Sequence, residues 1–144
     1  MTERRDAPVS LSEAAKEAAR EAAATHRLEL ADNPNPRIDY LVRLEGTLWR
    51  EDRQGETAIT LHYVPDRLLL RAAAFDDYLK HLTTVEAGPS LPERLALRVL
   101  GDVNDELVPR WLQVVVGAGP HRVLVEDRQP KWDNRALLDR VSGL

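Results

Sequence analysis

The chain has 144 residues, the size of one domain, and its 43% hydrophobic and 31% charged residues argue against a disordered chain or a membrane span. Its formal net charge of -4 gives no long-range attraction for phosphate backbones, which argues against nucleic acid as the main partner. It contains no cysteine, so disulfides, thiolate metal sites and a thiol nucleophile are all excluded.

The N-terminal part is expected to be a helix followed by an arm. Ser10 and Glu13 have the spacing of a capping box, and alanines then recur on one helical face up to Ala23. Pro34 and Pro36 break this pattern. We therefore predict an alanine-rich helix and arm over residues 1–32 and a single domain over 33–144. Since no signal-peptide pattern is visible, a cytoplasmic location is expected.

Two strands and a hairpin are expected next. Residues 37–49 alternate apolar and polar side chains with the period of a half-buried strand, and 55–66 do the same. The polar segment between them predicts a turn. Residues 67–71 are expected to extend the second strand.

Helical spacing of apolar residues predicts a helix over 75–82, and a longer helix from Ser90 that ends before Pro109. Two β-rich runs, 110–117 and 121–128, are divided by a turn and predict a second hairpin. A short helix capped by Asp133 is expected to close the chain.

This order of elements predicts an α+β fold, a four-stranded antiparallel sheet with two helices, placed between its second and third strands, on one face. Such a sheet has two unpaired edges. Because edge-to-edge pairing into a closed ring would satisfy both, a homo-oligomer is expected.

Four segments, IDYLVRL, ITLHYVPD, FDDYLKHL and LVPRWLQV, resemble successive landmarks of the QueF nitrile reductases, which reduce 7-cyano-7-deazaguanine with NADPH. The most specific are the run that ends in Pro65 and Asp66 and the triplet Pro109, Arg110, Trp111. The resemblance implies the tunnelling fold, or T-fold, in which subunits form a barrel and bind heterocycles between neighbours.

The chain departs from that family at the positions that carry its chemistry. The loop that would hold the nucleophilic cysteine has none, and only Glu56 lies near the position of the family's proton-transfer aspartate. Arg71 and the alanines 72–74 replace a polar hinge. The glycines that let a backbone approach a dinucleotide phosphate are missing, so no cofactor is expected and the catalytic residues, if any, are unknown.

Glu93 occupies the position where the resemblance implies a carboxylate that holds the amide edge of a purine or pterin. An equally good interpretation is that Glu93 completes a capping box with Ser90. Arg71, Trp49 and Glu56 complete the predicted substrate-binding set. The four histidines are dispersed, so no metal site is expected.

Three functions follow as hypotheses. The first is binding of a purine-like or 7-deazaguanine-like heterocycle at a subunit interface, without nitrile reduction. The second is a catalytically silent structural or regulatory subunit. The third is cofactor-free acid–base chemistry with Glu56, His81 or Tyr78 transferring the proton.

Overall fold

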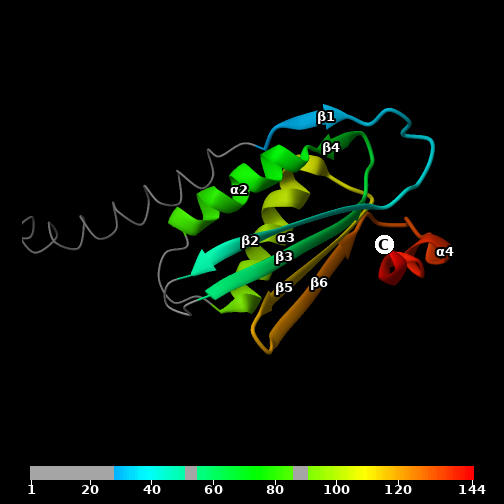
Figure 1. Cartoon of the computed structure of the whole chain (residues 1–144). Helices are drawn as coiled ribbons and strands as arrows, with labels where there is room; N and C mark the ends of the chain where they lie inside the picture. The colour runs from blue at the N-terminus through cyan, green and yellow to red at the C-terminus, as the bar shows by residue number, and fades with distance from the viewer. Residues whose placement is uncertain (1–27, 51–54, 86–90) are drawn as a thin grey trace, which may run out of the picture.

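The computed structural model describes residues 28–50, 55–85 and 91–144. Four strands form one antiparallel sheet in the order β2-β3-β5-β6: β2 (Val42–Arg50), β3 (Gly55–Val64), β5 (Trp111–Ala118) and β6 (His121–Arg128). Helices α2 (Ala72–Val85) and α3 (Pro92–Leu107) cover one face (Figure 1). The predicted α+β class, with an antiparallel sheet and helices on one face, is confirmed. The expected N-terminal helix lies outside the described residues.

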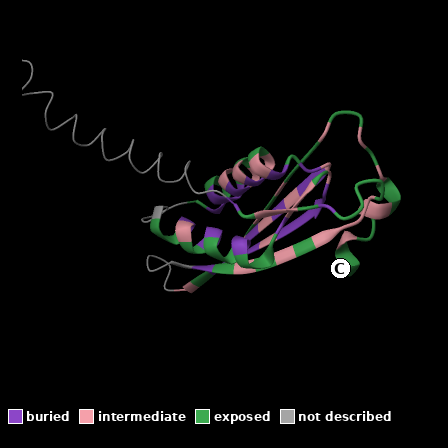
Figure 2. Ribbon diagram, turned by 90° about the horizontal axis from the view of Figure 1, so that it is seen from above, coloured by how far each residue is buried: buried purple, intermediate pink, exposed green. Residues whose placement is uncertain are grey.

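The core lies between the helix pair and the sheet, where buried positions of the two layers face each other (Figure 2). The period-2 pattern produces this arrangement, because alternate residues of a strand point to the same face. On β3 and β5 the helix-facing positions are fully buried: Ile59, Leu61, Tyr63, Leu112, Val114 and Val116. The helices contribute residues at helical spacing, among them Phe75, Leu79, Leu82, Leu95, Val99 and Val103.

Residues 67–71 do not extend the second strand as expected. Leu68–Leu70 forms a separate strand, β4, which pairs with β1 (Leu30–Asp32) in a two-stranded sheet. The turn after Val64 contains Pro65, which lacks the N–H that a continued ladder needs. Tyr63 stabilises the new strand, since its buried hydroxyl accepts a hydrogen bond from the backbone N–H of Leu70 at 3.0 Å.

The arm before β2 is held by side chains and does not continue that strand. β2 begins at Val42, later than the sequence pattern indicates. Asn33 is buried and bonds to the backbone oxygen of Asp66 at 2.7 Å, and the Tyr40 hydroxyl donates to Asn33 Oδ1 at 2.7 Å. These contacts fix residues 33–41 outside the ladder. The division at residue 32 stays a prediction, because most of the first part is not described.

Helix α3 begins at Pro92 and has Leu91 as its N-cap, so the expected start at Ser90 is wrong. Ser90 itself lies outside the described residues. The helix ends before Pro109, as predicted, through Val108, which adopts a left-handed conformation with φ 45° and donates its N–H to Asn104. This conformation is costly for a β-branched residue.

A C-terminal segment lies across the end of the sheet face opposite the helices (Figure 1). It contains α4 (Arg135–Leu138) and the 3-10 helix η2 (Val141–Gly143). Asn134, not the expected Asp133, caps α4, because its Oδ1 accepts the N–H of Leu137 at 3.2 Å. Within the described part of the chain, no helix has the length and apolar character needed to cross a membrane.

Candidate functional site

Glu93 lies in the first turn of α3, where the positive end of the helix dipole favours a carboxylate. Its side chain is 53% exposed, and His121 Nε2 lies 2.9 Å from its Oε2. His121 is the first residue of β6, so the turn between β5 and β6 helps to hold the carboxylate in place. Glu93 is thus an ordered, accessible acceptor at one end of the molecule.

Trp49 and Glu56 lie at the same end of the sheet as Glu93. They are direct cross-strand partners, one residue from the end of β2 and one residue from the start of β3. Glu56 is exposed. Two strands separate β2 from β6, a distance of about 14 Å at the usual strand spacing. Within one chain, Trp49 and Glu93 therefore lie at the same end of the sheet, Trp49 at the edge that β2 forms and Glu93 near the edge that β6 forms.

Arg71 lies at the other end of the molecule. It follows β4 directly and precedes α2, and its guanidinium is 3.7 Å from the carboxylate of Glu29. The three alanines after it form the first turn of α2, and only Ala74 is buried. The structure thus separates Arg71 from the other three predicted substrate-binding residues within one chain.

No protein-family model matches this chain, and no curated protein matches it. Among solved structures, the chain is similar to the archaeosine synthase QueF-Like in its apo form. The two share 20% sequence identity, the match covers 65% of this chain and 96% of that chain, and the TM-score is 0.46.

The two most specific landmarks of the sequence meet in space. Arg110 Nη2 donates to Asp66 Oδ1, and Arg110 Nη1 donates to Asp39 Oδ1, both at 3.1 Å. Asp39 also accepts hydrogen bonds from the Trp132 indole and from Asn134 through its other oxygen. This network connects the arm, the turn after β3 and the C-terminal segment. Because its polar groups satisfy one another, we assign it a structural role.

Tyr78 and His81 lie on α2, one turn apart, as the sequence predicts. The Tyr78 hydroxyl is buried and donates to Asp102 Oδ2 on α3 at 2.7 Å. This bond joins the two helices. Glu56, the third proposed acid–base residue, is on β3. Among the residues described, no three His, Asp or Glu side chains gather into a group able to hold a metal ion.

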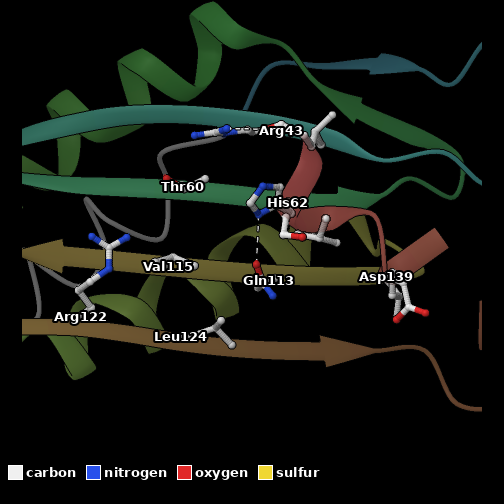
Figure 3. Close-up of a pocket in the computed structure, with 12 residues that line it drawn as sticks. Arg43, Thr60, His62, Gln113, Val115, Arg122, Leu124 and Asp139 are labelled. Atoms are coloured by element: carbon white, nitrogen blue, oxygen red, sulfur yellow. Dashed lines mark hydrogen bonds between the residues drawn. The ribbon is translucent and has the colours of Figure 1, made fainter. Parts of the chain in front are cut away.

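A groove that the sequence analysis did not predict lies on the free face of the sheet, the face opposite α2 and α3. It has a volume of about 480 Å³, and strand residues and the C-terminal segment line it together (Figure 3). Its signal in the sequence is the polar half of the strand alternation, which by itself does not distinguish a solvated face from a covered one. The side chains that line it include Arg43, Thr60, His62, Gln113, Val115, Arg122, Leu124 and Asp139.

His62 is the most enclosed polar group of this groove. Its side chain lies on the free face, as the alternation predicts, yet the residue is only 8% exposed. Its Nδ1 is 3.1 Å from Gln113 Oε1, in the direct cross-strand pair. Burial lowers the pKa of His62, and the neighbouring Arg43 lowers the pKa further. The hydrogen bond to Gln113 and the charge of Glu45 act in the opposite direction.

Proposed function

We propose that this chain is a cytoplasmic, QueF-related T-fold subunit that binds a purine-like or 7-deazaguanine-like heterocycle between neighbouring copies, without nitrile reductase chemistry of its own. The observation that carries the proposal is Glu93, an exposed carboxylate fixed in the first turn of α3. A carboxylate can accept two parallel N–H bonds from the amide edge of such a ring.

The sheet edges support an assembly that would complete the site. In the described part of the chain, nothing pairs with the outer edge of β2 or of β6. These strands run antiparallel to each other, so β6 of one copy can pair with β2 of a similarly oriented neighbour and continue the sheet. In a ring built this way, strand β2 of the neighbour would lie beside β6, at the edge of the sheet near Glu93. Arg71 would stay at the opposite end.

The proposed chemistry stops at binding because the chain itself supplies no thiol. A nitrile carbon requires a strong nucleophile, and cysteine thiolate is the side chain suited to that role at neutral pH. Ala72, Ala73 and Ala74 present only methyl groups at the start of α2. The missing thiol and the three alanines therefore support a protein that binds the heterocycle but does not reduce a nitrile.

The alternative is a catalytically silent structural or regulatory subunit. One observation favours it: the carboxylate of Glu93 already has an intramolecular partner in His121. A ligand would have to share or displace that contact. The two functions differ in whether the purified chain binds a heterocycle at all.

Isothermal titration calorimetry of the full chain with guanine, 7-cyano-7-deazaguanine and pterin tests the proposal. We expect one of these rings to bind and Glu93→Gln to weaken binding about 10- to 100-fold, the loss of a charged, two-bond contact. Glu106→Gln, the same change in the last turn of α3, is the matched control and should bind normally. Absence of binding by the wild type, or unchanged binding by Glu93→Gln, would refute the proposal.

Sedimentation of the same samples tests the assembly. We expect the wild type to sediment as a closed oligomer, because a chain with two free sheet edges can pair with itself. A monomer that nevertheless binds guanine would contradict the interface part of the proposal. Formation of a covalent adduct with 7-cyano-7-deazaguanine, detected by mass spectrometry, would contradict the part that excludes nitrile chemistry.

A further inference from the structure

The groove on the free face of the sheet combines a cation, an apolar floor and hydrogen-bonding groups, of which His62 is buried. We propose that it is a second binding site, for a small aromatic anion, meaning a flat ring that carries a carboxylate or a phosphate monoester. Its residues lie on the face opposite α2 and α3, so it is separate from the proposed heterocycle site at Glu93 and does not depend on it.

Arg122 provides the positive charge. Among the residues that the structure describes, its side chain forms no ion pair and no hydrogen bond, unlike Arg43, which pairs with Glu45 at 2.7 Å. The cross-strand partner of Arg122 is Gly117, and the Arg122 guanidinium lies 3.5 Å from the point where a Cβ of Gly117 would be. The absence of a side chain there lets the guanidinium lie against the sheet. Its planar fork matches both carboxylate and phosphate oxygens.

Val115 and Leu124 form the apolar floor beside this cation. They are direct cross-strand partners on β5 and β6. Leu124 is 57% exposed, one of few large apolar side chains that the described chain leaves open to solvent. It is two residues from Arg122 on the same strand and therefore about 7 Å further along the same face. A ring whose anionic group contacts Arg122 would lie over Val115 and Leu124.

Polar side chains adjoin this floor. Thr60 is the other cross-strand neighbour of Val115, and the pair His62 and Gln113 forms the next row on the same face, two residues away along each strand. Since Gln113 occupies Nδ1 of His62, Nε2 is the nitrogen with which a ligand would bond. Figure 3 shows this pair between Arg122 at one end of the groove and Asp139 at the other. The carboxylate of Asp139 repels an anion and so directs it to the Arg122 end.

The C-terminal segment closes one side of the groove. Leu138, Val141, Ser142 and Leu144 line it, and Arg43 donates to the backbone oxygen of Leu144 at 2.7 Å. This bond fastens the segment to β2. The groove therefore has a floor and a wall made by parts of the chain far apart in sequence.

Calorimetry of the full chain with phenyl phosphate, benzoate, neutral benzamide and inorganic phosphate tests this inference. We expect phenyl phosphate or benzoate to bind. Both benzamide, which lacks the anionic group, and inorganic phosphate, which lacks the ring, should bind at least about 10-fold more weakly. Whichever of the two aromatic anions binds with the higher affinity shows whether the site prefers a phosphate or a carboxylate. Arg122→Gln should reduce the affinity about 10-fold or more. Arg94→Gln, an exposed arginine on α3, should leave it unchanged.

Three results would overturn the inference: no binding of either aromatic anion, equal affinity for inorganic phosphate and phenyl phosphate, or unchanged affinity in Arg122→Gln. Because Arg122 is exposed, its variant should fold normally, and circular dichroism checks this. The two proposals fail separately. Glu93→Gln should leave phenyl phosphate binding unchanged, and Arg122→Gln should leave guanine binding unchanged.

Discussion

The guanidinium of Arg110 lies 3.1 Å from the carboxylate of Asp66, although 44 residues separate them in sequence. A second carboxylate, that of Asp39, lies 3.1 Å from the same guanidinium. The Arg110 side chain is only 17% exposed, so this one cation neutralises two acids that are largely shielded from water. The arm, the turn after β3 and the strand β5 all depend on it.

We expect Arg110→Met to lower the free energy of unfolding by about 2 kcal/mol, because it leaves two partly shielded carboxylates without their cation. Arg128→Met is the matched control. Arg128 also pairs with two acids, Glu126 and Asp133, but its side chain is 41% exposed, so the loss should stay below about 1 kcal/mol. Urea unfolding measures both variants. Equal losses would mean that shielding does not distinguish the two networks.

Gly46 faces the helices at a point of close approach. A Cβ added there would lie 2.5 Å from Leu79 Cδ1 and 3.7 Å from the Phe75 ring, both buried. Gly46→Ala should therefore destabilise the protein by about 1–3 kcal/mol through overpacking. Gly101, on the exposed side of α3, has nothing within 4 Å of an added Cβ.

Gly101→Ala is the matched control for Gly46→Ala. It should stabilise the protein by up to about 1 kcal/mol, because alanine favours a helix over glycine. Thermal unfolding of both variants checks the pair. If Gly46→Ala were as stable as the wild type, the close contact between β2 and α2 would be wrong.

Tyr63→Phe removes the hydroxyl that accepts the backbone N–H of Leu70. That donor would then be buried without a partner, at a cost of about 1–3 kcal/mol. Tyr40→Phe removes a hydroxyl at a less buried site, where Asn33 Oδ1 keeps a bond from the N–H of Asn35, and should cost less. Denaturant unfolding ranks the two variants. Faster hydrogen exchange of the Leu70 amide in Tyr63→Phe would locate the loss in β4.

The stability of the protein should fall as the pH drops below about 6.5, and His62 should be one cause. Burial and Arg43 lower the pKa of His62 in the folded state, so the unfolded chain takes up the proton at higher pH. The contribution of His62 is complete above the ordinary imidazole value and is lost as the pH falls through the folded pKa. Arg122 and Asp139 also line the groove around this ring.

His62→Gln should flatten that part of the pH dependence, since glutamine does not titrate. The free energy of unfolding, measured for both proteins between about pH 7.5 and 5, checks this. The wild type should lose stability relative to the variant across the window. Parallel curves would show that His62 protonates equally well in both states.

The sequence by itself determined the α+β class, because the strand and helix periodicities are local and each is repeated over a whole element. It also determined the absence of a thiol and placed Glu93 at a helix start. It could not determine that residues 68–70 leave the main sheet, because their partner strand is Leu30–Asp32, far away in sequence. The predicted start of β2 was too early, since Asn33 in the arm holds Tyr40, and the distant Arg110 holds Asp39, outside the ladder.

Only the tertiary structure decided which residues share a site. It joined Asp66 to Arg110, paired Glu93 with His121, and placed Arg71 at the end opposite Glu93. It also revealed the groove over His62, which exists because the C-terminal segment folds back across the free face. Contacts of this kind depend on how elements pack, and the polar half of an alternating strand looks the same in sequence whether solvent or another segment covers it.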